Sequence, residues 1–161
     1  MIRYLLAMPR EADMLRKYAD QLPKGEIEVI GINAVDYTGG TENDVLVNVG
    51  YAGGYNVPVG TLVEPSVVYN MATGDAARID PLFLIERRLC FTSDSFVERP
   101  AVNLPSVYDM ELFKIAERPH KRLYAIKIVS DNLNEKDCEG FNDEASWKTA
   151  AALISRFVKE E

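Results

Sequence analysis

Short apolar runs alternate with segments of helical periodicity along most of the chain. Apolar residues dominate 3–8, 45–49, 61–69, 88–91 and 123–129, which are lengths typical of buried strands, and 26–32 is a further extended candidate. Between these runs the apolar spacing predicts a helix that begins at Pro9, a second that Asp109 caps or opens, and a third that Asn142 or Asp143 caps. This alternation favours an α/β fold with a mostly parallel sheet covered by helices on both faces. Residues 70–90 are harder to read, and Pro65 predicts a break in its strand.

Three glycines follow the predicted strand at 45–49. The segment 50–54 reads Gly-Tyr-Ala-Gly-Gly. Because glycine has no Cβ, we expect a tight turn here that lets the backbone approach a ligand closely.

Length and composition indicate one compact domain over residues 1–161. Hydrophobic residues make up 47% of the chain and charged residues 27%, as in ordinary globular proteins. The formal net charge of −7 argues against binding nucleic acid or an anionic membrane surface, since both attract an excess of Lys and Arg. No apolar run is long enough to cross a bilayer, and the first eight residues are better interpreted as a strand than as a signal peptide. The two cysteines, Cys90 and Cys138, form no close pair, so we expect a cytoplasmic protein without a disulfide.

Acidic residues stand at the ends of several predicted elements. Glu11 lies in the first turn after the first strand, Glu111 near the start of a helix, and Asp131 directly after the apolar run 123–129. Ligands of open α/β sheets bind at the carboxyl ends of the strands, so these carboxylates are candidates for one site. A helix N-terminus favours ionised Glu11, which suits a base, whereas partial desolvation of Asp131 suits an acid. Each also has a simpler explanation, because acidic residues favour helix termini and Ser-Asp-Asn is a common turn sequence.

Four segments of the chain carry a resemblance to a known family. They are Ala7-Met8-Pro9-Arg10-Glu11, residues 48–54, residues 92–97, and Asp109-Met110-Glu111 followed by 127–131. In this order and spacing they resemble the nucleoside phosphorylase and nucleosidase superfamily, and most closely the methylthioadenosine/S-adenosylhomocysteine nucleosidases. The resemblance implies a three-layer α/β fold with a mostly parallel mixed central sheet flanked by helices. It also implies a shortened form of that fold, with material missing between the first helix and Val45 and between Tyr69 and Cys90.

The resemblance assigns a role to individual residues. Glu11 matches the glutamate that activates the hydrolytic water, and Asp131 matches the aspartate that protonates N7 of the purine. Glu111 matches the carboxylate that holds the ribose hydroxyls. The other expected substrate contacts are Met110 beneath the sugar, Phe96 stacked on the base, Val97 reading the edge of the base, Ser130 supporting the acid, and Met8, Tyr51, Gly53 and Lys127 around them.

The implied activity is hydrolysis of the N-glycosidic bond of an adenosine-type nucleoside, with no cofactor and no metal. Carboxylates near the sugar would stabilise the positive charge that builds on the ribose as this bond breaks. Two alternatives stay open: a phosphate-dependent phosphorylase, which Arg10 and Lys127 favour, and a degenerate nucleoside-binding protein without turnover. Expected partners are a purine nucleoside, phosphate in the first alternative, and a second copy of the chain in a homodimer or higher oligomer.

Overall fold

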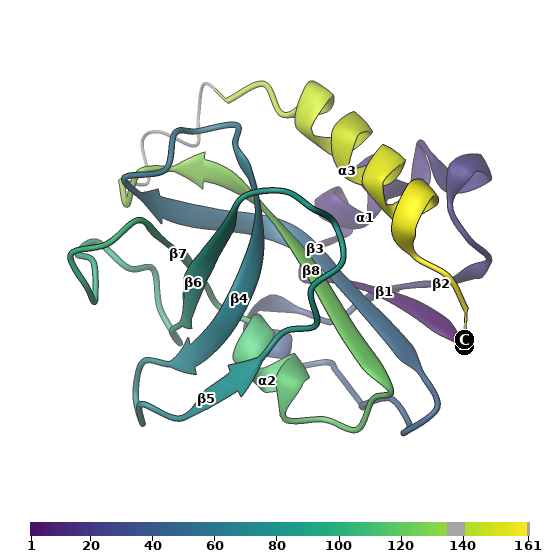
Figure 1. Cartoon of the computed structure of the whole chain (residues 1–161), viewed down its shortest axis with the longest axis horizontal. Helices are drawn as coiled ribbons and strands as arrows, with labels where there is room; N and C mark the ends of the chain where they lie inside the picture. The colour runs from purple at the N-terminus through teal and green to yellow at the C-terminus, as the bar shows by residue number, and fades with distance from the viewer. Residues whose placement is uncertain (135–140, 161) are drawn as a thin grey trace.

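A computed structural model describes residues 1–134 and 141–160 (Figure 1). Within these residues eight strands form one sheet: β1 (Ile2–Leu6), β2 (Gly25–Val29), β3 (Val45–Tyr55), β4 (Leu62–Asn70), β5 (Ala76–Arg78), β6 (Arg87–Thr92), β7 (Ser106–Asp109) and β8 (Arg122–Asp131). The helices are α1 (Pro9–Arg16), α2 (Leu112–Ala116) and α3 (Glu144–Phe157), and two 3₁₀ turns, η1 (Ala19–Gln21) and η2 (Ile32–Ala34), complete the order.

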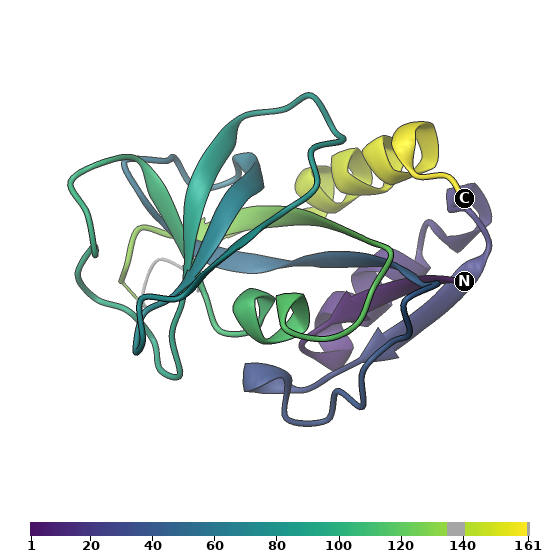
Figure 2. The same cartoon turned by 60° about the horizontal axis from the view of Figure 1, so that its bottom comes forward.

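Most pairings in this sheet are parallel, but the sheet closes on itself. β8 pairs with β3 on one side and with β4 on the other. β4 then pairs with β6, β6 with β7, and β7 with β3, so these five strands form a closed barrel. β1 and β2 extend the sheet beyond β3, and β5 extends it beyond β4 (Figure 2). The predicted layering is therefore corrected: helices cover the β1, β3 and β8 part of the sheet, and β3 and β8 also close into the barrel with β4, β6 and β7.

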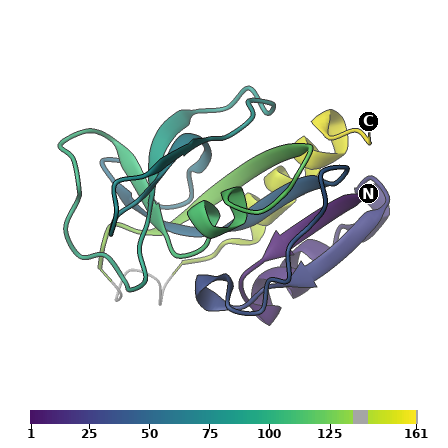
Figure 3. The ribbon, with the colours of Figure 1, turned by 90° about the horizontal axis from the view of Figure 1, so that it is seen from below.

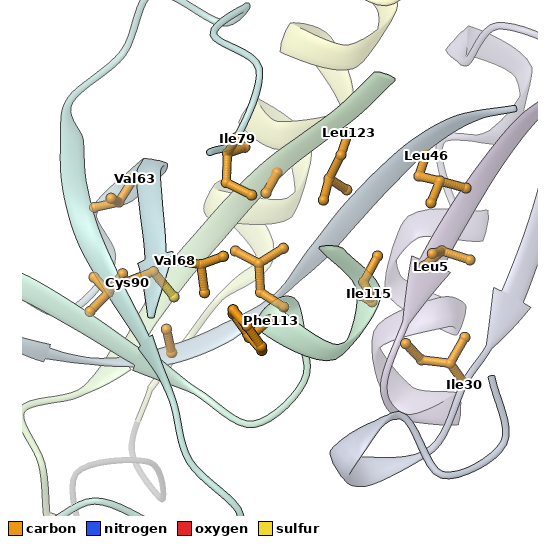
Figure 4. Close-up of a cluster of buried hydrophobic side chains, with 14 of the residues drawn as sticks. Leu5, Ile30, Leu46, Val63, Val68, Ile79, Cys90, Phe113, Ile115 and Leu123 are labelled. Atoms are coloured by element: carbon orange, nitrogen blue, oxygen red, sulfur yellow. The ribbon is translucent and has the colours of Figure 1, made fainter. Parts of the chain in front are cut away.

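Alternation along β8 explains how this sheet has an apolar cluster on each face. Leu123, Ala125 and Val129 pack in the cluster that also contains Phe113 and Ile115 of α2 (Figure 4). The intervening side chains join the opposite cluster with α1 and α3; they are Tyr124, Ile126 and Ile128, which share it with Leu15, Trp147 and Ile154. Since successive side chains of a strand point to opposite faces, a strand buried on both faces reads as the continuous apolar run seen in the sequence.

Several local expectations are corrected by the structure. The glycines of segment 50–54 do not form a turn, because β3 runs without interruption to Tyr55. β4 continues through Pro65, although its register with β6 shifts between Pro65 and Val68. Asp109 ends strand β7 and does not open a helix, but it caps α2, which begins at Leu112, because its Oδ2 accepts the Leu112 N–H at 2.7 Å. Of the two cysteines, Cys90 is buried and free, and Cys138 lies outside the described residues.

The first and last described segments lie at the same end of the molecule (Figure 3). The N-terminal ammonium of Met1 is 3.4 Å from a carboxylate oxygen of Glu160 and 3.5 Å from one of Asp44. The carboxyl ends of β1, β3 and β8 therefore lie away from this end, because β1 begins here and pairs in parallel with β3, which pairs in parallel with β8.

Candidate active site

One pocket of about 310 Å³ opens where several strands end. Its walls come from the junction of β1 and α1, the second half of β3, the loop at 95–97, the junction of β7 and α2, and the end of β8. The lining includes ten of the eleven site residues expected from the sequence: Met8, Glu11, Tyr51, Gly53, Phe96, Val97, Met110, Glu111, Ser130 and Asp131. The structure thus brings together residues that are more than a hundred positions apart in the sequence.

Two backbone amides hold Glu11, one from the residue before α1 and one from β3. Its Oε1 accepts a hydrogen bond from the Met8 N–H at 3.0 Å, and its Oε2 accepts one from the Tyr51 N–H at 2.9 Å. Burial raises the pKa of the Glu11 carboxyl, and it outweighs the opposing effects of these amides and of Lys127. The amide of Met8 at the start of α1 does favour the ionised form, as expected for a helix N-terminus, but burial has the larger effect. A carboxylate with a raised pKa is a stronger base than one in water.

Asp131 is fixed at the end of β8 by its neighbours in the chain. Its Oδ2 accepts the Ser130 hydroxyl at 3.0 Å, and its Oδ1 accepts the Leu133 N–H at 2.8 Å. The register between β3 and β8 shifts at this point, so that Asp131 lies opposite Gly53. Such irregularities in a strand change the direction of a side chain next to a site. The Asp131 residue is only 3% exposed, although it lines the pocket.

Two glycines of β3 allow the carboxylates to approach the strand. A Cβ at Gly50 would lie 2.9 Å from Oε2 of Glu11, and a Cβ at Gly53 would lie 3.0 Å from Oδ1 of Asp131. Neither glycine has a positive φ, so it is space and not backbone conformation that requires glycine here. We expected the backbone of segment 50–54 to approach a ligand closely. The structure shows instead that Gly50 and Gly53 lie close to two carboxylates of the protein itself.

Lys127 lies behind the pocket wall and forms a buried ion pair. Its ammonium is 2.9 Å from Oδ2 of Asp109, and both side chains are almost completely buried. Burial alone would lower the pKa of Lys127, but Asp109 and then Glu111 raise it above its ordinary value. Lys127 is thus a permanent cation beside the carboxylates, and it is the one expected site residue that does not line the pocket.

Glu111 lies directly before α2 and interacts electrostatically with the pair formed by Lys127 and Asp109. Its Oε2 accepts the Asn33 N–H at 3.0 Å. Burial raises the pKa of Glu111 to about 7; Asp109 and Glu11 add to this rise, and Lys127 opposes it. At neutral pH this carboxyl therefore takes both charge states.

Four acidic residues line the pocket, and all of them are buried. The exposed fraction is 2% for Glu11, 5% for Asp109, 7% for Glu111 and 3% for Asp131. Carboxylates gathered in a poorly solvated hollow favour a ligand or a transition state that carries positive charge. In the part of the chain that the structure describes, no group of three His, Cys, Asp or Glu side chains is arranged to hold a metal ion.

Comparison with known proteins reveals the relatives of this architecture. No protein-family model and no curated protein matches the sequence. Among solved structures, a methylthioadenosine/S-adenosylhomocysteine nucleosidase from Neisseria meningitidis, in complex with methylthio-immucillin-A, matches with a TM-score of 0.74 and 18% identity, over 96% of this chain and 98% of that chain. A Helicobacter pylori nucleosidase of the same name matches with a TM-score of 0.72 and 13% identity, over 96% of each chain.

The chain has the fold of the nucleoside phosphorylase and nucleosidase superfamily. A Chlamydia trachomatis nucleosidase supports the same conclusion, with a TM-score of 0.64 and 18% identity over 96% of this chain and 91% of that chain. The resemblance read from four short segments is therefore confirmed for the nucleosidase fold. The expected shortening of the chain stays a prediction.

The sequence interpretation missed some of the pocket. Asp109 was expected only to cap or open a helix, but in this nucleosidase fold it also ends β7, lines the pocket and binds Lys127. The apolar side chains of Ile32, Leu133 and Phe141 also line the pocket, and they come from segments without any motif. One signal for this role was present in the sequence. Asp109 stands two residues before Glu111 in a largely apolar segment, and two carboxylates so close together are unusual at the end of a buried strand.

Within residues 1–134 and 141–160, no helix is both long enough and apolar enough to span a membrane. The cytoplasmic location and the homo-oligomer stay predictions.

Proposed function

We propose that this protein is a nucleosidase that cleaves the N-glycosidic bond of an adenosine-type purine nucleoside with water. The observation that supports this most directly is the convergence of Glu11, Glu111 and Asp131 on one pocket that also contains an aromatic side chain, Phe96. The fold is that of nucleosidases, and related structures are described with methylthioadenosine and with adenine bound. Acidic groups around a sugar and an aromatic group for the base are what this chemistry requires.

In the proposed reaction Glu11 activates the water. Its carboxylate takes a proton from the water while the water oxygen forms a bond to C1′ of the ribose. The raised pKa of Glu11 makes it a better proton acceptor, and its two amide contacts hold it in one orientation. Removing Glu11 would therefore leave the water without a base.

Asp131 supplies the proton for the leaving group. As the bond between C1′ and N9 breaks, the Asp131 carboxyl donates a proton to N7, so the purine leaves as a neutral base. Its contacts from Ser130 and Leu133 fix the side chain at the end of β8. The proton that Glu11 takes from water later restores the acid, so no cofactor is needed for the balance of the reaction.

Glu111 and Met110 are proposed to hold the sugar, and Phe96 and Val97 the base. Positive charge on the ribose in the transition state would be stabilised by Glu111 and Glu11 on either side of it. Lys127 does not contact the substrate in this proposal, because it lies behind the wall and keeps Asp109 ionised.

Hydrolysis is favoured over phosphorolysis by the charge of the pocket. A phosphate ion would have to enter a hollow lined by four buried acidic side chains, and Lys127 is already paired with Asp109. Arg10 is the one cationic side chain among the described lining residues, and it is an exposed one. Repulsion between phosphate and these carboxylates is much stronger in a poorly solvated pocket than in water.

The test is release of the free base from adenosine, 5′-methylthioadenosine and inosine, each with and without phosphate. We expect release without phosphate, and a loss of about 100-fold or more in Asp131→Asn. The matched control is Asp13→Asn, which changes an exposed carboxylate of α1 outside the pocket. Strict dependence on phosphate would show a phosphorylase instead. Purine binding with equally poor turnover by the native chain and Asp131→Asn would show a degenerate binding protein.

A further inference from the structure

Asp143 stands at the N-cap position of α3, but its carboxylate does not cap the helix. An aspartate at this position usually accepts a hydrogen bond from a backbone N–H of the first helical turn. The Asp143 side chain makes no such bond, although the residue is only 5% exposed. Its Oδ2 instead accepts the Tyr51 hydroxyl and, at 3.1 Å, the indole N–H of Trp147, and it lies 3.4 Å from Nη2 of Arg10. The carboxylate is therefore directed away from its own helix and toward two residues of the pocket wall, Arg10 and Tyr51.

Arg10 and Tyr51 belong to the two elements that hold Glu11. Arg10 directly precedes Glu11 in α1, and the N–H of Met8, the N-cap residue of α1, donates to Oε1 of the glutamate. Tyr51 belongs to β3, and its N–H donates to Oε2. The Arg10 guanidinium also lies over the Tyr51 ring, 5.5 Å from the ring centroid, in a cation–π arrangement. Asp143 thus joins α1 to β3, the two elements from which the hydrogen bonds to Glu11 come.

Around Tyr51, strand β3 is paired on one side only. Its pairing with β1 ends at Asn48, and its pairing with β7 begins at Gly53. Between these positions β8 is the one neighbouring strand among the described residues, and the register with β8 shifts directly before Gly53. A strand segment with few backbone hydrogen bonds is held less firmly than one paired on both sides. The Tyr51 side chain supplies a second anchor here, because it is bound by Asp143 and packs edge-to-face on Trp147, with ring centroids 5.8 Å apart.

We propose that Asp143 is a positioning residue for the base of the reaction: through Tyr51 it holds Glu11 in the orientation that activates water. The inference rests on the proposed function, in which Glu11 is that base. Asp143 binds the Tyr51 hydroxyl and does not itself line the pocket, so it acts on the reaction without contacting the substrate. Its contact with Arg10 contributes as well, since Arg10 belongs to the helix that carries Glu11.

Tyr51→Phe and Asp143→Ala test the proposal, because each removes one partner of the same hydrogen bond. Tyr51→Phe keeps the aromatic ring and the backbone N–H, and it changes no charge. We expect kcat for base release to fall about tenfold in each variant with little change in KM, because a small displacement of a reacting group lowers the rate of the chemical step. The double variant should lose little more than either single variant, since both changes break one link.

Ser146→Ala is the matched control. The Ser146 hydroxyl also ties the first turn of α3 to the rest of the molecule, through a hydrogen bond of 3.2 Å to the carbonyl of Gly60 that involves neither Arg10 nor Tyr51. We expect Ser146→Ala to lower the stability of the fold and to keep the native kcat. An equal loss of kcat in Ser146→Ala would overturn the proposal, and so would a native kcat in Tyr51→Phe or losses that multiply in the double variant.

The titration of Glu11 is a readout that does not depend on turnover. The Tyr51 N–H lowers the pKa of Glu11, so displacement of this N–H raises that pKa. The charged groups that also act on Glu11 are Lys127 of β8 and Glu111 before α2, and Tyr51→Phe changes neither. NMR of the glutamate carboxyl carbons should therefore show Glu11 titrating at higher pH in Tyr51→Phe than in the native chain, and an unchanged titration would overturn the proposal. Absent base release by the native chain would contradict the proposed function alone, because this titration still tests the positioning.

Discussion

The charge state of Glu111 links the candidate site to the stability of the fold. Burial raises its pKa from 4.5 to about 7, with contributions from Asp109 and Glu11 in the same direction and from Lys127 in the opposite one. The folded state therefore binds a proton more tightly than the unfolded state. The stabilisation is complete below pH 4.5 and is lost as the pH rises through 7.

The magnitude follows from this change in pKa. At about 1.4 kcal/mol for each pKa unit, a rise in the pKa of Glu111 from 4.5 to about 7 contributes on the order of 3 kcal/mol to the free energy of unfolding at low pH. Glu111→Gln removes the titration but keeps a side-chain oxygen that can accept the Asn33 N–H. Between pH 4.5 and pH 8, we expect the stability of this variant to rise by about 3 kcal/mol relative to the native chain.

Urea unfolding at several pH values measures this difference. Trp147 is the only tryptophan of the chain and is completely buried, so its fluorescence reports global unfolding. The control is Glu117→Gln, which makes the same substitution at an exposed glutamate directly after α2. A constant difference between Glu111→Gln and the native chain from pH 4.5 to pH 8 would refute the reasoning.

Three further predictions follow from the packing of the site. Gly50→Ala places a Cβ 2.9 Å from Glu11, so base release should fall by about tenfold or more while the circular dichroism of the fold is retained. Lys127→Met leaves Asp109 buried without its cation, which should cost about 3–5 kcal/mol in chemical denaturation, and adding Asp109→Asn should recover part of that loss. Phe96→Ala should weaken adenine binding about tenfold by calorimetry if the ring stacks on the base, and unchanged affinity would exclude that contact.

The sequence alone determined the class of the fold and most of the candidate site. Runs such as 123–129 are apolar on both faces except for Lys127, and this pattern is typical of strands buried between two layers. Residues next to predicted strand ends, such as Glu11 and Asp131, were placed in the pocket correctly because strand direction and connection order restrict where such ends lie. Local patterns indicated the α/β class and the three carboxylates, whereas the other site residues came from the resemblance of four short segments to a known family.

The tertiary structure decided how the sheet closes, which backbone amides hold the carboxylates, and which cation pairs with a buried carboxylate. Closure depends on β8 pairing with both β3 and β4, which is a contact between distant segments that no local periodicity encodes. The same is true of the pair between Lys127 and Asp109, and of the amide that Tyr51 directs at Glu11. Burial, which sets the pKa of these groups, is a property of the packed molecule, so the sequence predicted the acidic residues of the site but not their charge states.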